Sequence, residues 1–221
     1  MRRPHLNGSV VFAFFLLQKG AEGEFRMGIV ARWEWRTFGE GSFGDCEEKL
    51  RALGVDSSKK TEELYILSKN SDENIKIRFD VIDVKALQKV NEDSLEQWLP
   101  VLKTGFPIAA EQLSALFNIF NVKEPEFKRE SYTYEQFLDE LIRPCEELEL
   151  VEVKKSREIF KPEGATAEIA ETVFNGRPWR TICVEHEDPA LVMKIVKELG
   201  LEGKPNINYI QAMKKSVGLS R

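Results

Sequence analysis

Pairs of like-charged residues spaced two positions apart are the pattern in this sequence that could carry chemistry. Lys155 and Arg157 form one such pair, and Glu185 and Glu187 form another. In a β-strand, side chains two positions apart point to the same face. Rows of like charge inside a sheet are costly unless they meet ligands, metal ions or each other. We therefore interpret both pairs as candidate binding residues.

Two earlier segments repeat this spacing with basic residues. Residues 74–80 place Lys76 and Arg78 on one face and apolar side chains on the other, and residues 81–90 continue with Lys85. Lysine and arginine bind anions through charge-assisted hydrogen bonds. Carboxylates are hard oxygen ligands that suit Mg²⁺ or Mn²⁺. The spacing therefore predicts anion contacts from these segments and cation contacts from the glutamate pair.

The first predicted strand combines both kinds of charge. Arg32, Glu34 and Arg36 share one face, whereas Trp33 and Trp35 share the other. Aromatic residues on the second face favour packing against helices. The first face is wholly charged, and it would line a site or meet solvent.

Periodicity and turn signals predict the elements that must position these residues. We expect strands over 29–38, 62–68, 74–80, 81–90, 127–132, 151–160, 167–173 and 181–187, and helices over 42–53, 94–103, 109–120, 133–141, 189–200 and 209–216. Adjacent strands joined by short turns are most simply antiparallel. A closed or nearly closed barrel would place the apolar faces under helices and the charged faces inside. A sandwich whose charged side faces water is the alternative.

Composition limits the class of protein. A chain of 221 residues that is 42% hydrophobic can form one large domain or two small ones. A net charge of −5 argues against binding nucleic-acid duplexes through a basic surface, although a basic cavity could still take an anion. Cys46, Cys145 and Cys183 show neither metal spacing nor a disulfide framework. We therefore expect a cytoplasmic protein that does not bind a membrane.

The first 26 residues differ in pattern from the rest of the chain. Arg2 and Arg3 precede a short apolar run over 10–17, and a second methionine, Met27, stands just before the first predicted strand. We expect residues 1–26 to be an extension outside the fold and residues 27–221 to form one domain. The alternative is a secretory signal peptide, although the run is too short to span a bilayer and no convincing cleavage site follows it.

The ordered motifs resemble the CYTH superfamily, the triphosphate tunnel metalloenzymes, over nearly all of residues 29–215. That family opens with two alternating glutamates followed by a lysine; here Glu34 and Arg36 take the second and third positions, and Arg32 replaces the first glutamate. The further matching motifs are Lys76-Ile77-Arg78, Lys85, Lys155-Ser156-Arg157 and Glu185-His186-Glu187.

The resemblance implies an α+β fold: an eight-stranded antiparallel β-barrel, open at both ends as a tunnel, with flanking helices. It implies phosphate contacts from six basic residues, namely Arg36, Lys76, Arg78, Lys85, Lys155 and Arg157. The implied ligands of Mg²⁺ or Mn²⁺ are Glu34, Glu185 and Glu187. Glu168 is the candidate catalytic residue that would orient the attacking water, with Glu171 as the other possible register.

The implied function is metal-dependent hydrolysis of inorganic triphosphate, short polyphosphate or an organic triphosphate. A non-catalytic polyphosphate- or nucleotide-binding module is the main alternative, because Arg32 and Ala170 stand where carboxylates are expected. An adenylate cyclase is a third possibility. The glutamate pair could also form plain cross-strand ion pairs with Lys155 and Arg157. The sequence makes no prediction of the oligomeric state.

Overall fold

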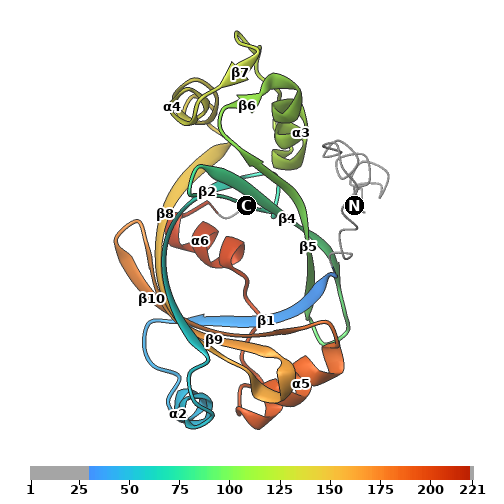
Figure 1. Cartoon of the computed structure of the whole chain (residues 1–221), viewed down its shortest axis with the longest axis vertical. Helices are drawn as coiled ribbons and strands as arrows, with labels where there is room; N and C mark the ends of the chain where they lie inside the picture. The colour runs from blue at the N-terminus through green and yellow to red at the C-terminus, as the bar shows by residue number, and fades with distance from the viewer. Residues whose placement is uncertain (1–29, 220–221) are drawn as a thin grey trace.

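The computed structural model describes residues 30–219, and its centre is a closed barrel of antiparallel strands (Figure 1). Around the ring the order is β1–β10–β9–β8–β2–β3–β4–β5. The strands are β1 Arg32–Gly39, β2 Ser57–Ser68, β3 Asn74–Arg78, β4 Val81–Val90, β5 Glu96–Gly105, β8 Leu148–Phe160, β9 Thr166–Phe174 and β10 Arg177–His186. The predicted eight-stranded barrel with flanking helices is confirmed, and the sandwich alternative is wrong.

Helices and one small sheet accompany the barrel. The helices are α2 Asp45–Ala52, α3 Ala110–Phe120, α4 Tyr134–Gln136, α5 Pro189–Glu198 and α6 Tyr209–Val217, with a π-helical turn Phe137–Ile142 after α4 and a 3-10 turn Pro162–Gly164. The small sheet pairs β6 Ile108–Ala109 with β7 Ser131–Tyr132. Over the described range, no helix combines the length and apolar character needed to cross a membrane.

The prediction of a helix over 94–103 is wrong, because that segment forms β5. Pro100 would break a helix interior. In β5 it instead lies opposite Lys85, beside a register shift where β5 carries one extra residue, Val101, and a bulge tolerates a proline in a sheet. β5 pairs with β4 on one side and β1 on the other, so it closes the ring. The predicted strand over 127–132 is reduced to Ser131–Tyr132, outside the barrel.

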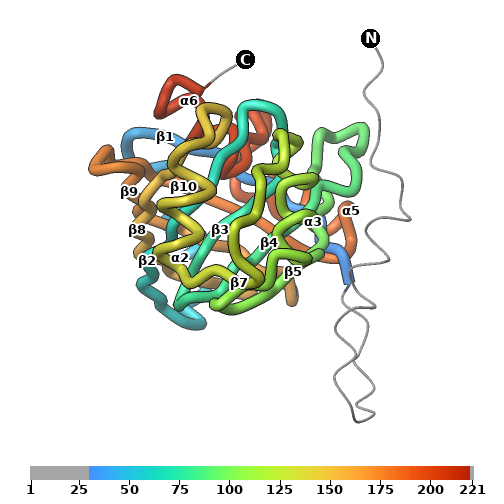
Figure 2. The backbone as a smooth tube through the Cα atoms, turned by 90° about the horizontal axis from the view of Figure 1, so that it is seen from above, coloured from blue at the N-terminus to red at the C-terminus, as the bar shows by residue number. Residues whose placement is uncertain are grey.

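The outer lobe (residues 108–142, comprising β6, α3, β7, α4 and the π-helical turn) covers one side of the barrel. Figure 2 shows α3 and β7 lying across β3, β4 and β5. The apolar side chains of this interface form one buried cluster, in which Ile77 and Val84 of the barrel wall join Leu116, Phe117 and Phe137 of the lobe. Burying the outer face of β2–β5 in this way turns the alternate side chains of those strands inward.

The opposite wall is covered by α2 and α5. Trp33 and Trp35 of β1 are buried there, as predicted, together with Leu50 of α2 and Ile195 of α5. Because Trp33 and Trp35 point outward, the intervening charged residues of β1 point into the barrel.

Helix α6 lies within the ring of strands when the barrel is viewed end-on (Figure 1), and the side-on view places it at one end of the barrel (Figure 2). Its side chains Tyr209, Ile210 and Met213 pack against inward-facing apolar residues of the barrel, including Tyr65 and Phe174. The family resemblance implies a tunnel open at both ends. In this chain the lumen is open at one mouth and closed at the other by α6 and this apolar cluster.

Candidate functional site

The open part of the lumen is an inner cavity of about 230 Å³ with charged walls. Along β1, Glu34 and Arg36 line this cavity, and Phe38 then joins the apolar cluster around α6. Along β8, Arg157 and Lys155 line it in the same way before the strand reaches the apolar cluster. The cavity therefore has a charged entrance side and an apolar floor.

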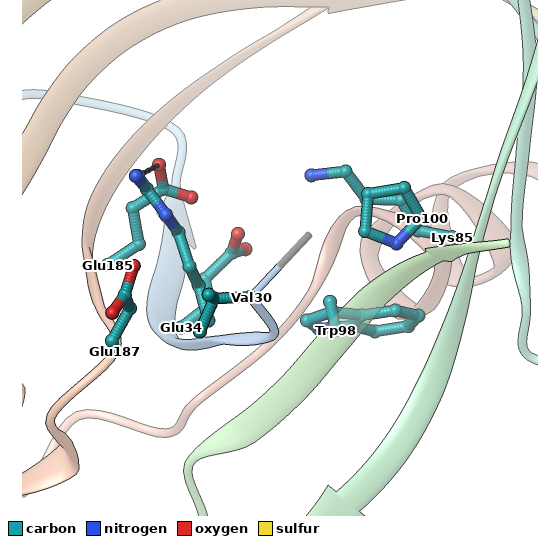
Figure 3. Close-up of a pocket in the computed structure, with 8 residues that line it drawn as sticks. Val30, Glu34, Lys85, Trp98, Pro100, Glu185 and Glu187 are labelled. Atoms are coloured by element: carbon teal, nitrogen blue, oxygen red, sulfur yellow. Dashed lines mark hydrogen bonds and ion pairs between the residues drawn. The ribbon is translucent and has the colours of Figure 1, made fainter. Parts of the chain in front are cut away.

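A wider outer cavity forms the mouth. Arg32, Glu34, Lys85, Glu185 and Glu187 all line it. Figure 3 shows Glu34, Glu185 and Glu187 on one side, with Lys85 across from them. Glu34, Lys85 and Glu185 also line the inner cavity, so the two cavities adjoin at these residues.

A chain of ion pairs crosses the inner cavity from β1 to β8. Arg36 Nε lies 2.8 Å from Glu34 Oε1, and Arg36 Nη1 lies 3.1 Å from Glu168 Oε1. The second oxygen of Glu168 lies 3.5 Å from Arg157 Nη1. Burial opposes ionisation of Glu34, but Arg36, Lys85 and Lys155 together outweigh burial and lower the pKa of that carboxyl. The register favoured for Glu168 in the sequence is thus the one that faces the cavity.

Glu63 of β2 anchors a second ion-pair cluster that sequence reasoning missed. Its carboxylate lies 2.8 Å from Lys155 Nζ, 3.4 Å from Lys76 Nζ and 3.3 Å from Arg78 Nη1. Burial acts to raise the pKa of Glu63, but these cations hold that pKa at about 2. Burial lowers the pKa of Lys155 to about 7, against the opposing pull of Glu63. The sequence did contain a signal for Glu63: it stands two positions before Tyr65, so the two side chains lie on the same face of the strand.

Glu96 of β5 is a second residue that sequence reasoning missed. It lies opposite Glu34 in the β1–β5 pair, and Glu34 lies opposite Glu185 in the β1–β10 pair. Burial raises the pKa of Glu96 to about 6, while Asn208 Nδ2 donates to its two oxygens at 2.9 and 3.0 Å. The mistaken helix over this segment concealed the face on which Glu96 lies.

Three cationic or donor groups in the cavity lack partners in the described part of the chain. Arg157 Nε and the Tyr209 hydroxyl are buried atoms with no hydrogen-bond partner there. Lys85 lines the same inner cavity, where its charge helps to lower the pKa of Glu34, but within residues 30–219 it makes no close ion pair. Buried donors are normally satisfied, and each one left unpaired costs about 1–3 kcal/mol. An anionic ligand would satisfy these groups.

The carboxylates predicted as metal ligands do not fit a resident divalent cation as they are arranged. Glu34 is bound by Arg36, and Glu185 Oε1 lies 3.2 Å from Arg32 Nη1. Across residues 30–219, no group of three or more His, Cys, Asp or Glu side chains is arranged to hold a metal ion. A divalent cation would have to displace two guanidinium groups.

Most of the predicted site residues meet in the lumen. The inner cavity gathers eight of them, namely Glu34, Arg36, Lys76, Lys85, Lys155, Arg157, Glu168 and Glu185. Glu187 lines only the outer cavity, and Arg78 contacts Glu63 without lining either cavity. Glu185 and Glu187 do not form the alternative cross-strand ion pairs with Lys155 and Arg157. Arg157 pairs with Glu168, and Lys155 pairs with Glu63.

No family model and no curated protein matches this chain. Among solved structures, it is similar to a candidate adenylyl cyclase from Hippeastrum described as having a dominant triphosphatase activity (14% identity, 84% of this chain and 96% of the other covered, TM-score 0.49). It is also similar to a candidate adenylate cyclase from Bacillus halodurans (12%, 81% and 96%, TM-score 0.44). An RNA triphosphatase from S. pombe is a more distant match (9%, 98% and 91%, TM-score 0.29). Membership of the CYTH superfamily stays a prediction.

Proposed function

We propose that the lumen binds an oligophosphate: inorganic triphosphate, a short polyphosphate, or the triphosphate group of an organic molecule. The observation that carries this proposal is the set of unpartnered cavity groups, Arg157 Nε, the Tyr209 hydroxyl and Lys85. The inner cavity is lined by five lysine or arginine side chains against three glutamates, although the whole chain carries a charge of −5. Such a concentration of cations suits a ligand with several adjacent negative charges.

The shape of the lumen supports a chain end rather than a polymer passing through. Lys155 and Arg157 stand two positions apart on β8, which spaces them by roughly 6–7 Å along the strand. Helix α6 closes the lumen beyond them. A linear ligand entering at the mouth would therefore lie along β8 and stop at the apolar floor.

Binding is tested by titration calorimetry with tripolyphosphate, thiamine triphosphate and ATP. Arg157→Ala should weaken tripolyphosphate binding on the order of tenfold to a hundredfold, because a charged hydrogen bond is lost. Lys154→Ala is the matched control, since Lys154 lies on the same strand, is exposed and pairs with Glu62 outside the barrel. Equal affinities for wild type and Arg157→Ala, or no binding by wild type, would contradict the proposal.

Hydrolysis of a phosphoanhydride bond is the second candidate function. It is favoured by Glu168, whose carboxylate is held between Arg36 and Arg157 inside the cavity. In that position the carboxylate could orient a water toward a phosphate bound by the two arginines. A divalent cation that arrives as the Mg²⁺ or Mn²⁺ complex of a triphosphate would be part of the substrate.

Phosphate release from the same three compounds tests this second candidate, with Mg²⁺ or Mn²⁺ and with chelator. Glu168→Gln should abolish release yet keep tripolyphosphate binding. Unchanged turnover in Glu168→Gln would remove that residue from the reaction. Binding without release from any compound would leave a binding module, and formation of cyclic AMP from ATP would favour the cyclase alternative.

A further inference from the structure

The mouth of the lumen places a guanidinium among carboxylates. Arg32 Nη1 lies 3.2 Å from Glu185 Oε1, and Glu34 and Glu187 line the same outer cavity. Figure 3 shows these three glutamates close together on one wall, facing Lys85. A cation is therefore already present where the carboxylates meet.

The two arginine–glutamate pairs of this wall differ in exposure. The side chains of Arg36 and Glu34 are 8% and 17% exposed, and this pair lies within the inner wall. Those of Arg32 and Glu185 are 51% and 27% exposed. An exposed ion pair contributes little net stability, so Arg32 can exchange one partner for another at small cost.

We propose that Arg32, rather than a resident divalent cation, neutralises the carboxylates at the mouth, and that its guanidinium binds phosphate there directly. This inference rests on the proposed oligophosphate binding. A guanidinium has five N–H donors, and the contact with Glu185 uses one of them. The remaining donors make no hydrogen bond within residues 30–219, so they can bind phosphate oxygens in the bidentate manner typical of arginine. Lys85 supplies a second cation across the mouth.

The first test compares tripolyphosphate binding to the wild-type chain in chelator and in Mn²⁺. We expect affinities that agree within about threefold, because the cation at the mouth belongs to the protein. We also expect no saturable Mn²⁺ binding to the wild-type chain alone, measured by electron paramagnetic resonance. Binding that disappears in chelator and returns with Mn²⁺ would overturn this inference while leaving oligophosphate binding intact. No binding in either buffer would overturn the proposed function itself.

Two variants of Arg32 sharpen the test. Arg32→Gln should lower tripolyphosphate affinity in chelator about tenfold or more, because the charged donor is lost. Arg32→Glu should gain saturable Mn²⁺ binding, because it adds a third carboxylate beside Glu34 and Glu185. Arg177→Gln is the matched control. Arg177 is similarly exposed and pairs with Glu40, but it lies at the end of β10 that is far from Glu185.

Unchanged tripolyphosphate affinity in Arg32→Gln would remove Arg32 from the phosphate contacts and overturn the inference. Mn²⁺ binding to wild type equal to that of Arg32→Glu would do the same, because it would show that the arginine does not replace a metal. Circular dichroism spectra of all variants establish that each one is folded before binding is compared.

Discussion

Lys155 is a lumen residue whose charge depends on its surroundings. Its side chain is 4% exposed, its Nζ atom donates to the Tyr65 hydroxyl at 2.8 Å, and it lies 3.8 Å from the centre of the Tyr209 ring. Burial lowers its pKa to about 7, and the nearby Glu63 opposes that shift. A bound anion would favour the protonated form, so binding and protonation of Lys155 are coupled.

We therefore expect tripolyphosphate affinity to fall as pH rises above about 7, by at most tenfold per pH unit, because the free protein must then take up a proton to bind. Ionisation of the ligand acts in the opposite direction and cannot produce this fall. Calorimetry over a pH series measures the effect. Lys155→Arg stays charged throughout and should lack the fall. A fall of the same size in Lys155→Arg would contradict this assignment.

Glu63 is the counter-ion shared by three cations, and its side chain is 1% exposed. Glu63→Gln keeps the shape but leaves Lys155, Lys76 and Arg78 without their carboxylate. Breaking a buried ion pair in this way costs about 3–5 kcal/mol, so we expect that loss in the free energy of unfolding, measured with urea.

Glu62→Gln is the control for this change. Glu62 is the preceding residue on β2, points outward and is 78% exposed in a pair with Lys154. We expect a change within about 0.5 kcal/mol, as for most surface substitutions. Equal stability of the two variants would show that the Glu63 cluster contributes no net stabilisation.

At the scale of elements, the ends of α6 are marked by capping residues in the sequence. Its buried position is not predictable from any local pattern. Asn208 caps the helix by accepting from the backbone N–H of Gln211, and Gly218 ends it in the left-handed conformation at φ 72°. These end signals are local, and the helix predicted over 209–216 is confirmed. Its place within the barrel depends on apolar residues from several strands.

Met213 tests this packing, because it is fully buried between α6 and the barrel. Met213→Ala should lower the free energy of unfolding by about 2–5 kcal/mol through the cavity that it leaves. It should also weaken tripolyphosphate binding, because Tyr209 on the same helix lines the inner cavity. Lys215→Ala, on the exposed side of α6, should change neither quantity. A fully stable Met213→Ala would indicate that α6 is not needed to fill the lumen.

At the scale of the whole molecule, the ring of strands defines the folded unit. β1 pairs with β10 on one side and with β5 on the other, and the first paired residue is Arg32. Among residues 30–219, the three buried clusters likewise begin at Trp33. The predicted extension over residues 1–26 lies outside the described residues, and its separation from the fold stays a prediction, as does the cytoplasmic location.

A chain that begins at Met27 should therefore keep the unfolding temperature and the tripolyphosphate affinity of the full chain, because every described barrel pairing remains. Thermal unfolding followed by tryptophan fluorescence, together with calorimetry, measures both. A chain that begins at Thr37 is the control, and it should not fold because most of β1 is missing. A large loss of stability in the chain from Met27 would place the preceding residues in the fold.

The sequence by itself determined the faces of the strands. Alternation is a local property, so it correctly separated Trp33 and Trp35 from the charged residues between them, and it put Lys155 and Arg157 on one inward face. It failed for β5, where helix-like apolar spacing concealed a strand that closes the barrel.

Only the tertiary structure decided which charges meet. Cross-strand register and barrel closure are non-local, so no spacing in the sequence pairs Arg32 with Glu185, sets Glu96 opposite Glu34, or gathers three cations around Glu63. Local capping residues determine the ends of α6, but its burial in the lumen depends on the surrounding strands. The charged faces were therefore predictable from the sequence, whereas the partners of those charges and the closed end of the lumen required the folded chain.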